Sequence, residues 1–238
     1  MRLIKINSLN TPKYKRNTKK IKYIVIHYTG MQSKRESIKR LTDVRHEVSC
    51  HYLIDRKGII AQMIDDHKVA WHAGKSKWKG LENLNEHSIG IELVNKGHSI
   101  NYENFPNSQI KSLTKVCVFL KKKYKIKKNC ILGHSDIAPL RKKDPGEKFP
   151  WEKLSKKGIG IWYASSNKNY LVLKEKKLRN LFFKNLYKIG YRYFNKKKKS
   201  KTDRLVVKAF QRRFLQSKID GKIDEKTFNI SHFLANKA

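Results

Sequence analysis

The sequence predicts an α/β protein, with a layered domain built on a mainly buried sheet and a small all-helical domain after it. Short apolar runs rich in β-branched residues alternate with segments of helical periodicity along most of the chain. These apolar runs are continuous rather than alternating, which is typical of strands covered on both faces. Towards the C-terminus only helical patterns remain.

Three apolar runs predict buried strands. KYIVIHYTG at residues 22–30 gives a strand that ends at His27. SIGIELV at residues 88–94 gives a second strand, and NCILGH at residues 129–134 gives a third that ends at His134. β-Branched enrichment and short length favour strands over buried helices for all three segments.

A hairpin and two helices complete the predicted α/β domain. HYLIDRKGIIAQMI at residues 51–64 alternates around a turn at Asp55–Gly58, as hairpins do. SKRESIKRLTDVRHE at residues 33–47 opens with a Ser33–Glu36 capping box and predicts a helix. The second helix is predicted at residues 107–124, where apolar residues recur at helical spacing: Ile110, Leu113, Val116 and Leu120.

The composition changes beyond FPWEKL, which ends at Leu154. GIGIWYASSNKNY at residues 158–170 is rich in Gly, Ser, Asn and aromatic residues and predicts a linker. We therefore expect an α/β domain over residues 1–163, a linker over 164–174 and a helical domain over 175–238. The predicted helices have apolar faces at Leu178–Ile189 and Leu205–Phe214, with a solvated loop at Lys196–Lys199, and a last helix begins at Asp224.

Length and composition limit the class of protein. A chain of 238 residues suffices for one sizeable domain and a smaller module, and 39% hydrophobic residues exclude a mostly disordered protein. No apolar run approaches the roughly 20 residues that span a bilayer. The start, MRLIKINSLNTPKYKRN, lacks a long apolar region, which predicts a cytoplasmic protein unless export uses another route or the true start lies upstream. Three cysteines without CxxC spacing predict neither a disulfide framework nor a cysteine metal site.

The formal net charge of +37 is the most extreme feature of the composition. Such a field attracts polyanions, including nucleic acid, anionic lipid and acidic wall polymers. Lysines number 44 and arginines 12, and both are scattered along the chain. Proteins that recognise phosphates or bases of nucleic acids favour arginine over lysine, because the planar guanidinium group can form two parallel hydrogen bonds. We therefore interpret the charge mainly as compositional bias, with attraction to an anionic substrate as a consequence.

Polar side chains interrupt the predicted strands at His27, Glu92 and His134. Because strand carboxyl ends gather at one edge of an open α/β sheet, we expect these groups to lie close together. Burying Glu92 inside an apolar run is costly unless it is paired or functional. With Asp144, ten residues after His134, the two imidazoles form an N/N/O set that suits Zn²⁺ with one position open to water.

These groups predict hydrolytic chemistry when they are taken together. Glu92 would take a proton from the attacking water and deliver it to the leaving amine. Lys142 would place its ammonium group against the oxyanion of the tetrahedral intermediate. Each group alone has an ordinary structural explanation, since Asp144 before Pro-Gly is a common turn residue. Only their joint placement favours catalysis.

Four stretches of the chain resemble the bacterial zinc-dependent N-acetylmuramoyl-L-alanine amidases, a superfamily that includes the peptidoglycan recognition proteins. They are IVIHYTG, VAWHAGKSKWKG, LNEHSIGIELVN and LGHSDIAPLRKKDPGEKFPWEKL, within about residues 20–163. The resemblance implies a mixed β-sheet flanked by helices and cleavage of the amide between muramic acid and the stem peptide's L-Ala. It places the zinc ligands at His27, His134 and Asp144, and the catalytic pair at Glu92 and Lys142.

The resemblance also suggests substrate contacts. The motif AWHAG would line the cleft, with His72 and the backbone of Ala73 and Gly74 contacting sugar or peptide; alternatively, His72 is a surface or supporting histidine. Trp78 would either stack on a glycan ring or cap the core. In one departure from the family pattern, Leu140 stands where the family has Gly, so a positive φ there would strain the chain.

The tail VVKAFQRRFLQSKIDGKIDEKTF resembles a peptidoglycan-binding helical module, whose basic residues would meet stem-peptide carboxylates. The alternative is a helical cap with no ligand of its own. Two other functions stay open: a recognition protein that holds muropeptides without cutting them, and a nucleic-acid binder that uses Arg212 and Arg213. We expect a monomer that acts on peptidoglycan or on smaller anhydro-muropeptides and binds no nucleic acid.

Overall fold

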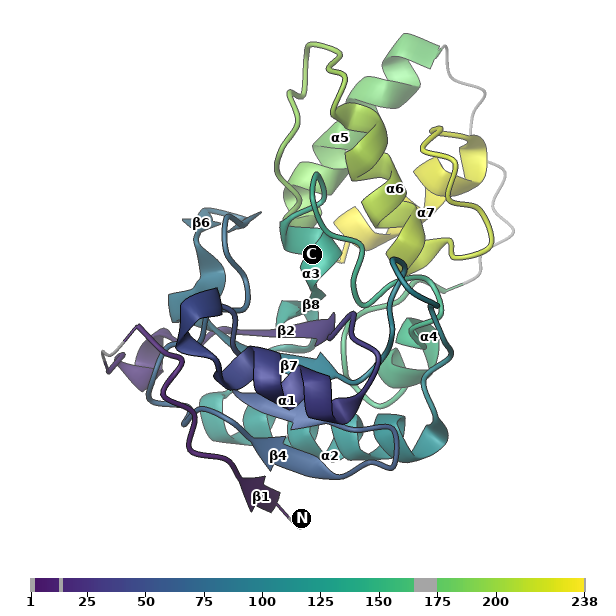
Figure 1. The fold of residues 1–238 in the computed structure, drawn as a ribbon. Coiled ribbons are helices and arrows are strands. Elements are labelled where there is room, and N and C mark those ends of the chain that lie inside the picture. Colours follow the sequence, from purple (N-terminus) through teal and green to yellow (C-terminus); the bar gives the residue numbers. More distant parts are fainter. Residues whose placement is uncertain (1–2, 13–14, 165–174, 238) are drawn as a thin grey trace.

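The computed structural model describes residues 3–12, 15–164 and 175–237, and its centre is a six-stranded mixed sheet (Figure 1). The strand order is β1-β4-β3-β7-β2-β8. β3 and β4 are antiparallel, and every other neighbouring pair is parallel. The strands are β1 (Leu3–Lys5), β2 (Tyr23–Tyr28), β3 (Tyr52–Ile54), β4 (Ile60–Gln62), β7 (Ser88–Leu93) and β8 (Ile131–Gly133). The predicted mixed α/β fold is therefore confirmed.

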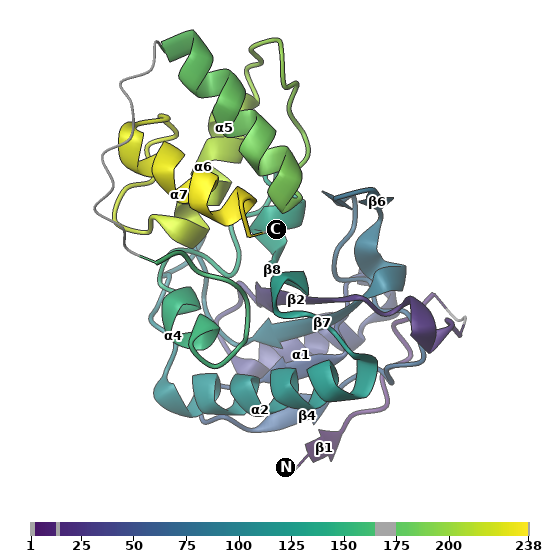
Figure 2. The same ribbon diagram turned by 180° about the vertical axis from the view of Figure 1, so that it is seen from behind.

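Helices cover the sheet on both faces. α2 (Asn107–Tyr124) lies behind the sheet in Figure 1 and in front of it in Figure 2, and α1 (Lys34–Thr42) lies on the opposite face. Side chains alternate along β2, so Ile24 and Ile26 pack in the cluster formed with α2. His27 therefore points to the face opposite α2. Glu92 alternates with Ile91 and Leu93 of that cluster, so it points to the same face as His27.

The C-terminal helices α5 (Glu175–Ile189), α6 (Asp203–Phe214) and α7 (Glu225–Ala235) lie beside the β8 edge (Figures 1 and 2). They share one hydrophobic core with the sheet, since Val25 and Leu132 belong to the same cluster as Phe182 and Phe210. The helical region therefore packs on the α/β region through apolar side chains. Most of the predicted linker, residues 165–174, lies outside the described residues.

Several local predictions are refined by the structure. Ser33 caps α1 by accepting from Glu36 N, but the Glu36 carboxylate accepts from Gln32 N rather than closing the predicted box. β8 ends at Gly133, so His134 is the first residue of the short helix α3 (His134–Ile137) instead of the last strand residue. Elements that the sequence did not predict are β1, α4 (Trp151–Ser155), the β5–β6 hairpin (Lys77–Trp78 and Leu81–Glu82), and the 3-10 turns η1 (Thr18–Lys20), η2 (Val44–His46), η3 (Leu84–His87) and η4 (Lys128–Cys130).

Two further findings concern membrane-spanning helices and the paired arginines of α6. Among the described residues, no helix combines the length and apolarity that crossing a membrane would require. The Arg212–Arg213 pair is turned inward, because Arg213 is 3% exposed and ion-paired with Asp136, while Arg212 Nε lies 3.4 Å from Glu147. These two arginines therefore do not project from the surface to contact a groove of DNA. The nucleic-acid hypothesis rested on this pair, so the structure does not support it.

Candidate metal centre and active site

The sheet register brings the predicted site residues together. His27 on β2 and Glu92 on β7 are direct neighbours in the parallel pairing. β8 lies on the other side of β2, and its last residue leads directly into His134. The loop that carries Asp144 is fastened to the start of α3, because Ser135 N donates to the Asp144 carbonyl at 2.9 Å. Three separate segments therefore meet at one end of the sheet.

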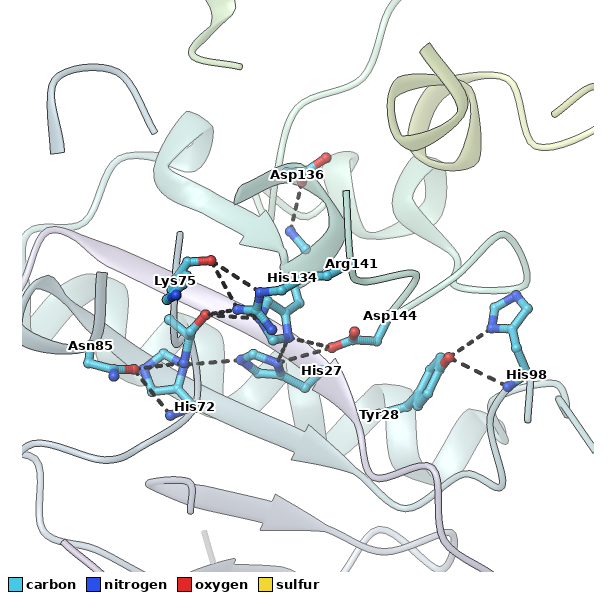
Figure 3. A network of polar contacts seen from close by, with 12 residues as sticks. His27, Tyr28, His72, Lys75, Asn85, His98, His134, Asp136, Arg141 and Asp144 are labelled. Atoms are coloured by element: carbon cyan, nitrogen blue, oxygen red, sulfur yellow. Dashed lines mark hydrogen bonds and ion pairs between the residues drawn. The ribbon is translucent and has the colours of Figure 1, made fainter. Parts of the chain in front are cut away.

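His27, His134 and Asp144 converge on one point (Figure 3). Asp144 Oδ2 lies 3.0 Å from His27 Nδ1 and 3.0 Å from His134 Nδ1, and the two nitrogens are 2.9 Å apart. All three side chains are buried, and their ligand atoms lie within 4.8 Å of one another. The set can hold a metal ion through two nitrogens and one oxygen.

A chain of hydrogen bonds fixes the protonation of His27. Ser88 Oγ donates to the Leu84 carbonyl at 2.6 Å, so it accepts from His72 Nε2 at 3.2 Å. The neutral His72 ring then accepts at Nδ1 from His27 Nε2, 3.1 Å away. The proton of His27 is therefore held on Nε2, and the Nδ1 lone pair points at Asp144 and His134. Partners of this kind set the tautomer and orientation of metal-binding histidines.

His134 is oriented in the same way from the other side. Its Nε2 lies 3.1 Å from the Ala73 carbonyl and 3.3 Å from Arg141 Nη2. A carbonyl oxygen can only accept, and Arg141 Nη2 has shorter bonds to two carbonyls, so Nε2 is the donor and the Nδ1 lone pair is free. Arg141 Nη2 bonds the same carbonyl and that of Lys75, and so holds the loop against the ring. Two nitrogen lone pairs and a carboxylate oxygen about 3 Å apart repel one another unless a cation lies among them. The donor set therefore fits a divalent ion.

Burial and charge set the protonation states of the site. Burial, helped by His134, lowers the pKa of His27 to about 4, so the ring is neutral at pH 7, the form that binds metals. Burial raises the pKa of Asp144, but at the low pH where Asp144 titrates the two imidazoles are protonated, and their charges and hydrogen bonds bring this pKa well below its usual value. Burial and the Asp144 charge raise the pKa of Glu92 to about 8. A strongly raised carboxyl pKa in such a cluster is typical of a proton-transfer residue.

Glu92 faces the site without being one of the three converging ligands. It is 8% exposed, and its Oε2 has no hydrogen-bond partner in the part of the chain that the structure describes. The positive charge of Lys142 lowers the pKa of both Glu92 and His27, so its ammonium group lies within electrostatic reach of these two residues.

The structure shows what the residues expected to contact substrate touch within the protein. Trp78 is 2% exposed and packs edge-on against Tyr191, with ring centroids 4.9 Å apart, so it belongs to the core and cannot stack on a sugar. His72 lies over Gly90, where an added Cβ would come within 2.4 Å of its ring, and supports His27. The backbone N–H of Ala73 donates to Asn85 Oδ1, and its carbonyl accepts from His134 Nε2, so both groups already have partners within the protein. Gly74, which is exposed, stays a predicted contact.

The departure at Leu140 carries no strain. Among the described residues, the non-glycine positions with positive φ are Glu47, Lys79, Asn83, Lys125 and Tyr193. Leu140 is not among them, and its side chain is 37% exposed. The loop between the two predicted ligands therefore accepts a side chain where the family has glycine.

A second set of hydrogen-bonded side chains, which we did not expect from the sequence, lies beside Asp144 (Figure 3). Tyr28, directly after His27, bonds His98 Nδ1 through its hydroxyl at 2.8 Å. His98 Nε2 lies 3.1 Å from the Glu147 carboxylate. Burial and the Asp144 charge raise the pKa of Tyr28 to about 12, so the phenol stays protonated. The adjacency of Tyr28 to His27 was the one available signal, because His98 and Glu147 come from separate loops.

A family model described as N-acetylmuramoyl-L-alanine amidase matches residues 17–147. The N-acetylmuramoyl-L-alanine amidase AmiD of Escherichia coli is 34% identical over 233 residues, which cover 92% of this chain and 83% of that protein. The 1,6-anhydro-N-acetylmuramyl-L-alanine amidase AmpD of Haemophilus influenzae is 44% identical over 107 residues, which cover 44% of this chain and 56% of that protein.

Solved structures give the same likeness over nearly the whole chain. The complex of Escherichia coli AmiD with the substrate anhydro-N-acetylmuramic acid-L-Ala-D-gamma-Glu-L-Lys has a TM-score of 0.81 at 31% identity, covering 96% of this chain and 93% of that chain. AmpDh3 from Pseudomonas aeruginosa has a TM-score of 0.79 at 28% identity, covering 95% of this chain and 94% of that chain. Both matches extend across the α/β region and the C-terminal helices.

Proposed function

The chain belongs to the N-acetylmuramoyl-L-alanine amidase family, and on this premise we propose that it cuts the amide between N-acetylmuramic acid and L-alanine as a zinc hydrolase. The proposed zinc ligands are His27 Nδ1, His134 Nδ1 and Asp144 Oδ2. The observation that carries the proposal is the convergence of these three buried atoms, with both imidazole Nε2 protons held elsewhere. A set of two nitrogens and one carboxylate oxygen is typical of catalytic zinc sites.

Zn²⁺ in this position would polarise the amide carbonyl and lower the pKa of a bound water. We propose that Glu92 accepts a proton from the attacking water and passes it to the nitrogen of the departing L-alanine. Its raised pKa of about 8 supports this, because a group that titrates near neutral pH can both accept and donate. Lys142 would hold its ammonium group against the oxyanion of the tetrahedral intermediate.

A recognition protein without activity is the less favoured function. Such a protein has no need of a complete ligand set, and here all three side chains converge. Glu92, the strand residue paired with His27, also has a buried Oε2 without a hydrogen-bond partner among the described residues. Both features support hydrolysis over passive binding.

The expected products test the function directly. Incubation with purified sacculi, and separately with soluble anhydro-muropeptides, should release stem peptides that begin with a free L-alanine amine, which mass spectrometry identifies. The complementary glycan product should carry the free lactyl carboxylate. If the products of either substrate keep the muramic acid–alanine bond and are cut elsewhere, the proposed reaction is wrong.

The region 175–238 is proposed to act as a peptidoglycan-binding module. A groove of about 1130 Å³ lies among α5, α6 and the following loops, with an apolar floor that includes Phe183 and Val207. Its rim is basic and includes Lys199, Lys201 and Lys222. An acidic stem peptide complements this charge.

The same product assay tests this module. We expect the double variant K199E/K201E to release less peptide from sacculi and to keep its rate on soluble muropeptides, since only the polymer needs a second attachment point. K184E/K188E, which changes two exposed lysines of α5 outside the groove, is the matched control. Equal losses in the two variants would assign the effect to net charge alone.

Replacing Lys142 tests the oxyanion role. K142M should lower kcat by ~10²–10³-fold, the usual cost of removing one group that stabilises an oxyanion. Zinc content should stay at the wild-type level, because Lys142 is not a proposed ligand. The adjacent exposed Lys143 supplies the matched control, and K143M should keep wild-type turnover. Full activity in K142M would exclude this residue from the mechanism.

A further inference from the structure

Asp136 connects the proposed metal site to the C-terminal helices. It lies two residues after His134 in α3 and is 1% exposed. Its Oδ2 accepts from Gly133 N at 2.7 Å, so the carboxylate caps the helix that begins with His134. α3 spans only four residues, and its own backbone bonds cannot hold it rigidly. The position of His134 therefore depends on what holds Asp136.

Two side chains from the C-terminal region hold Asp136. Tyr191, which follows α5, donates its hydroxyl to Asp136 Oδ1 at 2.5 Å. Arg213, near the end of α6, forms a buried ion pair with Asp136 Oδ2. With the helix cap, these contacts engage both carboxylate oxygens.

Arg213 reaches further than this one pair. Its Nη2 donates to the Ile131 carbonyl on β8 at 3.1 Å. Its guanidinium group lies over the Trp151 ring of α4 at 4.1 Å. The Arg213 side chain thus contacts β8, the short helix α3 that begins with His134, and α4. Figure 1 shows the end of α6 next to α3 and β8.

A buried ion pair adds little net stability compared with a well-packed apolar pair, but it fixes geometry, because each charged group must keep its partner. Neither Arg213 nor Tyr191 belongs to the metal-binding set. They contact β8 and α3, the segment that orients His134 Nδ1 toward Asp144. This pattern favours a role in alignment.

We propose that Asp136, Arg213 and Tyr191 are positioning residues of the metal site, through which the C-terminal helices set the affinity for zinc. The inference rests on the proposed zinc site. The helical module then completes the active site of this chain in addition to any role in wall binding. Its contacts act through α3, without touching the metal or the reacting amide.

The test uses the full chain and Zn²⁺ competition with a chromophoric chelator. Y191F removes one hydroxyl and keeps the packing of the ring, while R213M removes the ion pair. Each of these two variants should weaken zinc binding by ~10-fold or more, which is the usual effect of removing a residue that orients a metal ligand. R179M is the matched control, because Arg179 pairs with Asp203 at 2.5 Å within the helical module and away from α3.

R179M should lower the melting temperature while its zinc affinity stays within ~2-fold of wild type. Wild-type zinc affinity in Y191F overturns the inference, even if R213M fails to fold. It is also overturned if R179M weakens zinc binding as much as R213M, because the module would then act only through global stability. Absence of zinc binding in the wild type would instead refute the proposed zinc site itself.

Discussion

Glu92→Gln should lower turnover by at least ~10²-fold while zinc stays bound, because a positioned acid–base group contributes ~10²–10⁴-fold to such reactions. The substitution keeps the shape of the side chain and removes its ability to carry a proton. It also removes a carboxyl group whose ionisation is opposed by burial and by Asp144, so the variant should fold at least as well as the wild type. Release of L-alanine-terminated peptides and zinc content per chain are the two measurements.

Glu103→Gln is the control for this experiment. Glu103 pairs with Arg56 at 3.1 Å and with Lys96, and none of these residues belongs to the site. The control should keep both its turnover and its zinc. Wild-type turnover in Glu92→Gln would discard Glu92 as the proton-transfer residue, whereas loss of zinc in that variant would make Glu92 a support of the metal set.

Removal of the metal should stop the reaction. After exhaustive chelation we expect release of stem peptides to fall by at least ~10³-fold, because a Lewis-acid metal supplies several kcal/mol of transition-state stabilisation. Added Zn²⁺ should restore the rate. Mg²⁺ should not, since a site with two imidazole nitrogens does not suit an ion that prefers oxygen ligands.

The control for chelation is the same chelator saturated with Zn²⁺ before addition, which separates metal removal from direct inhibition. Circular dichroism of the chelated protein should show retained secondary structure, because a hydrophobic core on each face of the sheet supports the fold. Continued release of peptides by protein shown to be free of metal would exclude the proposed mechanism.

The sequence predicted the long elements of the fold well. The strand that contains His27, the hairpin around Asp55–Gly58 and the helix at residues 107–124 all occur where their patterns placed them. The missed strands, β1, β5 and β6, are two or three residues long. Segments of that length are too short to show periodicity, so pairing with another strand decides their structure.

The predicted metal ligands and Glu92 could be found because each is a polar residue at a strand end or in a nearby loop. Such placement is visible in the chain without knowledge of contacts. Trp78 shows the limit of this approach, since a large aromatic residue suits both a sugar platform and a core. The shared packing with Tyr191, more than a hundred residues away, decided between them.

The order of residues in the chain determined which groups are able to bind a metal or carry a proton, and where the sheet places them. Only the tertiary structure decided the protonation of His27 by His72 and Ser88, and the attachment of Asp136 to Arg213, 77 residues further along the chain. The physical reason is that a side chain's chemistry is a local property. Its burial and hydrogen-bond partners depend on segments that meet only when the chain folds.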